Sequence, residues 1–139
     1  MNAFSPSSRR FALAFFLSLL APSWLWAANS PPTITPISDR TINENTSTPA
    51  IAFTIGDDTT QVAELDLSAS SSDTGIVKTG NIVFGGGTGP NRTVTVTPDQ
   101  NAHGTVTISI TVTDTNGAAT TEDFPPMTSA QSPALEPAS

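Results

Sequence analysis

The sequence predicts an all-β fold, an antiparallel Greek-key β-sandwich of about seven strands between residues 29 and 124. Three observations predict it. After residue 28 the chain is rich in Thr, Ser, Val and Ile, is interrupted by Gly and Pro, and shows no apolar repeat at helical spacing. Apolar and polar residues alternate, which is typical of strands that bury one face of a sheet. The alternating segments are short and recur between turn residues, as expected for two packed sheets.

The first strands are expected near the start of this region. Thr33 to Ile37 is placed at a sheet edge, where Pro36 is tolerated because an edge N–H need not pair. Arg40 to Asn43 is expected to continue this strand after a turn. Ala50 to Ile55 is predicted to be a strand whose alternate apolar residues share one face: Ile51, Phe53 and Ile55.

Four shorter strands are expected next. They are Leu65 to Ala69, Ile76-Val77, Asn81 to Phe84 and Arg92 to Thr97. The glycine-rich run between residues 85 and 90 separates the last two and is expected to be a hairpin loop. No Lys-Ser/Thr pair follows this run and no helix is predicted there, so it lacks the features of a phosphate-binding loop.

The last predicted strands are the clearest. Thr105 to Thr113 directs four β-branched residues to the core: Val106, Ile108, Ile110 and Val112. Asn116-Gly117 then turns the chain, because both residues accept positive φ, and Ala118 to Phe124 is expected to return as the closing strand. Proline cannot continue a paired strand, so Pro125-Pro126 should end it. Residues 125–139 are rich in Pro, Ser and Ala and are expected to be a disordered tail.

Residues 1–27 have the composition of a secretory signal peptide. Arg9-Arg10 precedes an apolar run from Phe11 to Leu20, and small residues follow at Ala27-Ala28. The alternative is an uncleaved anchor, because Phe11 to Ala28 could just span a membrane if Pro22 were tolerated. Cleavage is favoured, so the protein is expected outside the cytoplasm, at the cell surface, in the periplasm or free. It should meet a membrane only transiently, through the signal peptide.

The composition of the exported chain excludes several classes of function. After removal of residues 1–27 it keeps three basic residues against twelve acids, a formal charge of −9. Such a surface repels nucleic acid and anionic lipid and attracts divalent cations or basic partners. Without any cysteine the chain cannot form disulfides, a lipoprotein anchor, a catalytic thiol or a cysteine-zinc site. His103 is the one histidine and has no obvious Ser partner, so we expect no enzymatic activity.

Four motifs in order carry a resemblance to a known family. They are P-P-T-I from Pro31, T-I-N-E-N-T from Thr41, T-V-T-V-T-P from Thr93 and T-I-S-I-T-V-T-D-T-N-G from Thr107. Together they resemble one repeat of the bacterial cadherin-like and immunoglobulin-like tandem domains of secreted and cell-surface proteins. The resemblance implies a non-enzymatic structural or adhesive module whose partners are other surface proteins or neighbouring copies. This chain departs from it in having a single copy that ends in Pro-Pro, as a truncated repeat would.

The resemblance also implies candidate calcium ligands. In cadherins, oxygen ligands come from an E-N element and an L-D-R-E element, which Glu44-Asn45 and Pro98 to Asn101 resemble. Asp99 would be a ligand, and Asn101 stands where the family has an acid. Asp114 with Asn116 and Gly117 resembles half of an EF-hand loop, although an Asx-stabilised hairpin explains the same residues without metal. Calcium prefers six to eight oxygens. The candidate ligands are Glu44, Asp99, Asn101 and Asp114.

A second hypothesis is an accessory module, binding calcium or carbohydrate, from a larger secreted enzyme. Carbohydrate modules usually expose aromatic side chains that stack on sugar rings. Both tryptophans lie within residues 1–27 and the chain has no tyrosine, which counts against this hypothesis.

Overall fold

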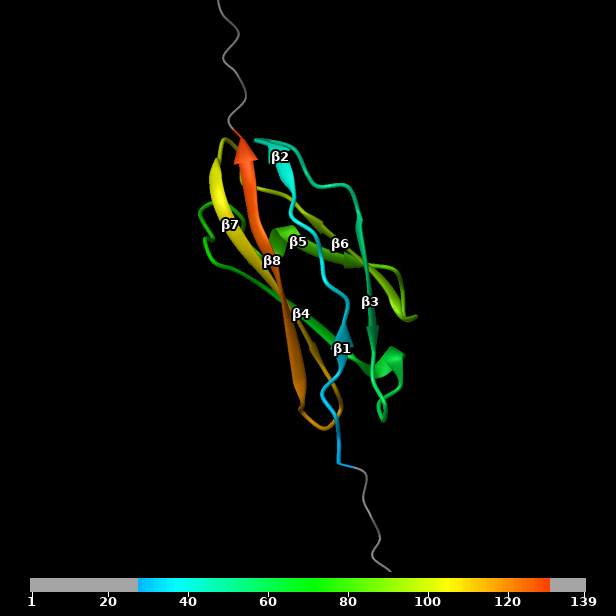
Figure 1. Ribbon diagram of the computed structural model, residues 1–139. Helices are drawn as coiled ribbons and strands as arrows, with labels where there is room; N and C mark the ends of the chain where they lie inside the picture. Colours follow the sequence, from blue (N-terminus) through cyan, green and yellow to red (C-terminus); the bar gives the residue numbers. More distant parts are fainter. Residues whose placement is uncertain (1–27, 131–139) are drawn as a thin grey trace, which may run out of the picture.

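The protein is described by a computed structural model that covers residues 28–130, so the predicted signal peptide and residues 131–139 lie outside the described part. The described chain forms two packed sheets of four strands each (Figure 1). In strand order, the first sheet contains β1 (Thr33–Ile34), β3 (Ile51–Gly56), β6 (Asn91–Val96) and β5 (Ile82–Gly85). The second contains β2 (Thr41–Asn43), β8 (Ala119–Ala130), β7 (Gly104–Thr113) and β4 (Asp66–Ser71).

The predicted β-sandwich is confirmed, with eight strands where about seven were expected. The first expected strand is divided: β1 pairs with β3 in one sheet, whereas β2 pairs with β8 in the other. The chain crosses between the sheets at Pro36 and Ile37, where the Ile37 N–H donates to the Glu122 carboxylate at 3.3 Å. Only two three-residue 3₁₀ turns interrupt the described strands, η1 (Val62–Glu64) and η2 (Thr79–Asn81), and neither approaches the length needed to span a bilayer.

The short strand expected at Ile76-Val77 is not present. Its two N–H groups both donate to the carbonyl of Asp73, at 3.2 and 3.0 Å, so the segment is a turn. Val77 is nevertheless fully buried. A β-branched pair favours a strand, but here Val77 is buried from a turn.

The core lies between the inner faces of the two sheets. The four predicted inward residues of β7 are all buried, and so are the alternate residues of β3 and β6 that face them: Ile51, Phe53, Ile55, Val94 and Val96. The rings of Phe53 and Phe84 meet edge to face with centroids 6.4 Å apart. Phe124 of β8 adds the third aromatic side chain. Because successive strand residues point to opposite faces, the alternation in the sequence is enough to direct these side chains inward.

Strand β8 runs past its predicted end, which corrects the expectation for residues 125–130. Ile108 of β7 pairs with Phe124 and Val106 pairs with Met127, so Pro125 and Pro126 together lie opposite a single residue, Thr107. This is the arrangement of a β-bulge, one of the few places in a sheet where proline is found. The paired strand therefore continues to residue 130 through the proline pair.

The neighbours of the bulge explain why the missing proline N–H groups are tolerated. The Thr107 N–H donates to the Ser72 hydroxyl and the Thr107 carbonyl accepts from the Ser72 N–H, each at 2.9 Å. Thr107 therefore directs its backbone groups towards the β4 side and needs no partner from β8. Beyond the bulge, β8 lies between β7 and β2.

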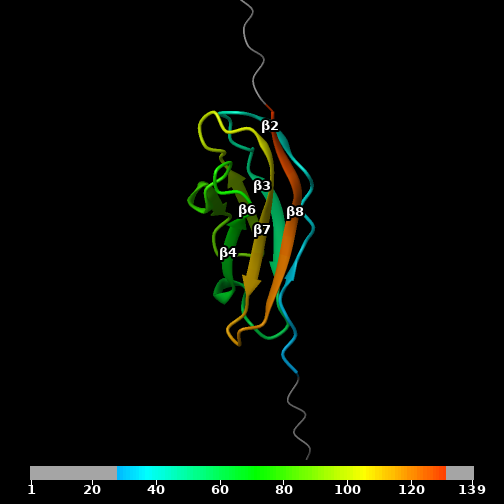
Figure 2. The same cartoon turned by 90° about the vertical axis from the view of Figure 1, so that its left-hand side faces the viewer.

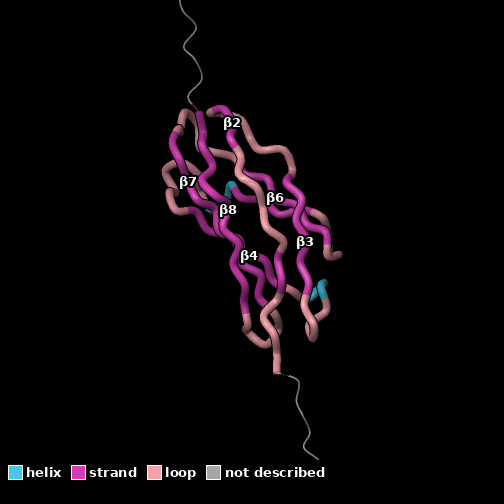
Figure 3. Tube along the Cα trace, viewed as in Figure 1, coloured by secondary structure: helices cyan, strands magenta, loops and turns pink. Residues whose placement is uncertain are grey.

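The two ends of the described chain lie at opposite ends of the sandwich (Figures 1 and 2). Residue 28 lies at what we call the lower pole, which carries residues 28–30, 57–61 and 114–118. Strand β8 ends at the upper pole, which carries residues 44–48 and 97–103. Figure 3 shows in pink the loops that join the strands at these poles. Strands β2 and β8 run in parallel towards the upper pole, whereas the other paired strands are antiparallel.

The continuation of β8 gives a first prediction. A chain that ends at Phe124 should be less stable than one that ends at Ala130, because β2 loses its partner and Gly104 to Val106 of β7 are left unpaired. A backbone hydrogen bond contributes about 1 kcal/mol net, so the free energy of unfolding should fall by about 2 kcal/mol or more. Urea unfolding followed by far-ultraviolet circular dichroism measures this. The chain ending at residue 139 is the control, and equal midpoints for all three chains would contradict the prediction.

Candidate functional site

The upper pole is closed by two asparagines in the left-handed backbone conformation, Asn45 (φ 61°) and Asn101 (φ 59°). The Asn101 N–H donates to Oδ1 of Asn45 at 2.8 Å, and Nδ2 of Asn45 donates to Oδ1 of Asn101 at 3.3 Å. Asparagine tolerates positive φ better than most residues, and its short amide bonds to nearby backbone. The amide of Asn101, a candidate calcium ligand, is thus used to join the loop after β2 to the loop before β7.

Asp99, the second candidate ligand at this pole, already has two partners. Oδ1 accepts a hydrogen bond from Nδ2 of Asn81 at 2.9 Å, and Oδ2 forms an ion pair with Lys78. Lys78 is largely exposed, and ion pairs of that kind contribute little to stability. Glu44 follows β2 on the same pole. The upper pole therefore brings Glu44, Asp99 and Asn101 to one end of the sandwich, and calcium binding by them stays a prediction.

Asp114 lies at the lower pole, at the other end of β7. Ten residues of strand separate the two loops, about 33 Å at the usual rise per residue, so Asp114 cannot share an ion with Asn101. Its Oδ1 accepts from the N–H groups of Asn116 and Ala118, both at 2.8 Å, which is the expected Asx-stabilised hairpin. Among residues 28–130 no three acidic or histidine side chains lie close enough together to hold a metal ion.

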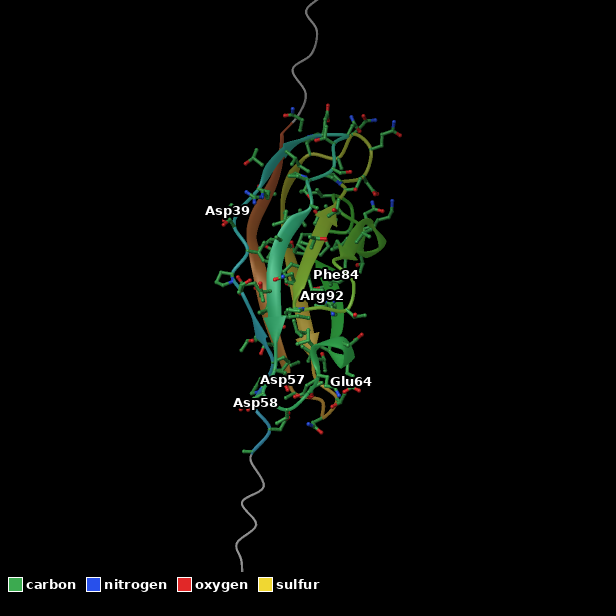
Figure 4. The ribbon with its side chains drawn as sticks, turned by 90° about the vertical axis from the view of Figure 1, so that its right-hand side faces the viewer. Asp39, Asp57, Asp58, Glu64, Phe84 and Arg92 are labelled. Atoms are coloured by element: carbon green, nitrogen blue, oxygen red, sulfur yellow. The ribbon has the colours of Figure 1, made fainter. Side chains whose placement is uncertain are left out.

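The lower pole contains a second carboxylate that the sequence analysis did not select. Oδ1 of Asp57 accepts from the N–H of Thr59 at 2.9 Å and from the N–H of Thr60. Its Oδ2 is buried and has no hydrogen-bond partner within the described residues. Figure 4 shows Asp57 and Asp58 at this pole. The strand pattern alone does not distinguish Asp57 and Asp58 from other acids that end a strand. The available signal was that acids directly follow both β3 and β7, whose ends meet at one pole.

Asn29 connects the start of the domain to both loops of the lower pole. Its Nδ2 donates to Oδ2 of Asp114 at 2.6 Å, and its Oδ1 accepts from Nδ2 of Asn116 and from the hydroxyl of Thr59, each at 2.9 Å. The contact joins residues 85 positions apart in the sequence. Spacing along the chain therefore could not reveal it.

These hydrogen bonds lower the pKa of both carboxylates. The amide of Asn29, followed by the N–H groups of Ala118 and Asn116, lowers the pKa of Asp114, although burial and the nearby charge of Asp57 oppose the effect. The N–H groups of Thr60 and Thr59 lower the pKa of Asp57. Both acids are therefore held in the ionised form.

Arg92 and Asp114 are the two buried charged residues of the part whose burial is described. The Arg92 side chain points from β6 between the sheets and is only 5% exposed (Figure 4). Nη2 donates to the carbonyl of Val62 at 3.4 Å, while Nε and Nη1 have no hydrogen-bond partner among the described residues. The side chain faces inward because Arg92 shares the parity of Val94 and Val96 on the strand.

The described surface offers no built cavity for a small ligand. No pocket is found among the described residues, and Val83, which is 58% exposed, is the one exposed large apolar side chain of residues 28–124. Small-molecule sites are usually concave and lined with apolar and aromatic groups.

The two carboxylates at the lower pole predict an acid-sensitive stability. A lowered pKa in the folded state stabilises the fold above the unfolded value, about 3.9 for Asp, and the effect is lost as pH falls through the folded pKa. The midpoint temperature of thermal unfolding should therefore decrease as the pH is lowered from about 5 to about 2. Asp114→Asn should lower the midpoint at pH 7 and flatten this dependence. Asp39→Asn is the control, because it changes an exposed acid that has no such hydrogen bonds, and it should leave the pH dependence of the midpoint unchanged. Identical curves for Asp114→Asn and the parent chain would contradict the assignment of this dependence to Asp114.

Two solved structures with TM-scores above 0.5 have the same fold at low sequence identity. A crystal structure of the titin M10–obscurin-like 1 immunoglobulin complex is 10% identical, with a TM-score of 0.53, and covers 76% of this chain and 100% of its own. The N-terminal Ig1-2 module of the Drosophila receptor protein tyrosine phosphatase DLAR is 12% identical, with a TM-score of 0.51. That match covers 77% of this chain and 53% of the DLAR chain. A structure of the SrpA adhesin from Streptococcus sanguinis is 20% identical over 78% of this chain and 62% of its own, with a TM-score of 0.47.

No curated protein sequence matches the chain significantly. The model of the bacterial Ig domain family, in contrast, matches residues 29–124, which is most of the sequence and nearly all of the sandwich. The match agrees with the two-sheet topology and confirms the resemblance to bacterial immunoglobulin-like domains. Domains with this immunoglobulin-like architecture are typically non-catalytic. The chain therefore belongs to the bacterial Ig domain family.

Proposed function

We propose that the protein is a non-enzymatic, exported module with a structural or adhesive role at the cell surface or in a secreted protein. The observation that carries the proposal is the placement of the chain ends at opposite poles of an elongated sandwich (Figure 1). A domain entered at one pole and left at the other can separate whatever is attached to its two ends. Other surface proteins or neighbouring copies of the domain are its proposed partners.

Two further features support this role. The chain has no cysteine, so its apolar core forms without disulfides and does not depend on the redox state of the compartment. The described residues also lack a pocket, which favours recognition through loops and edges over binding of a small substrate. Fold alone does not determine function, so export and surface exposure must be tested directly.

The export proposal is tested with the full chain carrying a C-terminal epitope tag in a bacterial host. We expect the exported protein to begin at Ala28 and to be recovered outside the cytoplasm, because residues 1–27 have the features of a signal peptide. N-terminal sequencing and cell fractionation measure this. A chain beginning at residue 28 is the control and should stay in the cytoplasm. Equal distribution of both chains would overturn export.

Stiffening by calcium is a second candidate function, and one feature of the lower pole favours it. Oδ2 of Asp57 is buried without a hydrogen-bond partner in the described residues, and the charge of Asp57 acts on Asp114 nearby. A buried, unpaired carboxylate oxygen is costly unless a cation or water satisfies it. Carboxylate and amide oxygens of Asp57, Asp114 and Asn29 are ligands that calcium accepts. Glu44, Asp99 and Asn101 are the candidate ligands at the upper pole.

Thermal unfolding with millimolar calcium and then with chelator tests this proposal and separates the poles. An ion that binds only the folded chain, at 100 times its dissociation constant, should add about 2.7 kcal/mol to the free energy of unfolding. If Asp57→Asn abolishes the calcium effect while Glu44→Ala and Asp99→Ala keep it, the calcium site lies at the lower pole. The reverse pattern would assign the upper pole. A midpoint that calcium leaves unchanged in the parent chain would exclude both.

A further inference from the structure

We propose that the free edge of strand β4 binds an extended basic peptide segment, which adds to the second sheet as a further strand. The inference rests on three properties of β4 (Asp66–Ser71): the direction of its backbone groups, its length together with its lack of proline and lysine, and the charge around it. It adds a class of partner to the proposed surface role. A spacer domain need not bind such a segment, so the two proposals can fail separately.

The backbone of β4 presents unpaired groups on one side. β4 is the last strand of its sheet and pairs only with β7 among the described residues. The Ser72 N–H donates to the Thr107 carbonyl, and in an antiparallel ladder the residues that face the partner strand recur at every second position. Ser70 and Ser68 therefore direct their N–H and C=O groups to β7. Leu67 and Ala69 direct theirs to the free edge.

This edge is longer than the others and contains no proline, lysine or bulge. It has six residues in unbroken register with β7, whereas the other edge strands β1, β2 and β5 have two, three and four. Natural edge strands are usually kept from pairing by proline, by charged side chains, above all lysine, by a bulge, by a covering loop or by very short length. The one charged residue of β4 is Asp66, at its first position. The sequence of β4, D-L-S-A-S-S, contains neither proline nor lysine. Its small serine and alanine side chains leave the backbone open to a second strand.

Charge indicates the partner. Exposed acids lie at both ends of the β4 edge, Glu64 and Asp66 at one and Asp73 at the other. Of the basic residues in the described part, Arg92 is buried and Lys78 is paired with Asp99, which leaves Arg40 on a surface otherwise dominated by acids. A second copy of this acidic chain would be repelled from the edge, whereas a segment with alternating Lys or Arg would be attracted. Strand addition takes its affinity from main-chain hydrogen bonds and its specificity from such side chains.

The test is a titration of the isotope-labelled chain from residue 28, which contains the whole described core, with a ten-residue peptide of alternating threonine and lysine. We expect slower amide exchange at Leu67 and Ala69, and binding that weakens as salt is raised, because the attraction between exposed charges is screened. A matched threonine–glutamate peptide should not bind. Ser68→Lys places a like charge on the outer face of the edge strand and should weaken binding about fivefold or more. Ala52→Lys makes the same charge change on the exposed face of β3 and should leave binding unchanged.

Several results would overturn the inference. Equal binding of both peptides would remove the charge argument, and protection confined to β5 or to the poles would place the partner elsewhere. Protection of Leu67 and Ala69 that grows with protein concentration in the absence of peptide would show that a second copy occupies the edge. No protection at any peptide concentration at low salt would show that the β4 edge does not accept a basic strand. Ser68→Lys and Ala52→Lys with equal affinity would likewise exclude this edge.

Discussion

The burial of one face of β7 is the constraint on which the rest of the structure depends. Its inward residues, Val106, Ile108, Ile110 and Val112, lie at the centre of the core, and its two edges pair with β4 and β8. Because the strand period is two residues, a shift of register by one would expose all four of these side chains. Without disulfides, this hydrophobic alternation sets the register of the second sheet and holds it against the first.

Polar side chains at the two poles accept hydrogen bonds from backbone N–H groups that the sheets do not pair. The loops there contain Asn and Asp residues whose oxygens accept backbone N–H groups that the sheets do not pair, as Asp114 and Asp57 do. The same oxygen chemistry makes these residues candidate cation ligands. Hydrogen bonding to the backbone and the proposed cation binding would use the same atoms. Oδ2 of Asp57 is a carboxylate oxygen that has no hydrogen-bond partner among the described residues.

The edges of the sandwich show how backbone chemistry, not side-chain type alone, decides what a strand can bind. Pro125 and Pro126 are tolerated inside a sheet because Thr107 has its backbone partners on Ser72. The segment beyond them can then lie between β7 and β2. At β4 the opposite holds, since the backbone groups of Leu67 and Ala69 have no strand beside them. A domain whose longest edge strand is β4 is suited to contacts along that side.

The sequence by itself determined the fold class, most strands and the inward residues of β7, because the alternation along a strand involves consecutive residues and can be read directly from the sequence. It also determined the Asp114 hairpin, which needs only residues four positions apart. It misplaced the end of β8 because a bulge depends on the opposite strand, and it missed Asn29 and Asp57 because their partners lie in distant loops. Only the tertiary structure separated Asp114 from Glu44, Asp99 and Asn101, since the direction of β7 carries its two ends to opposite poles. Proximity between loops is a property of strand topology, and no spacing along the chain encodes it.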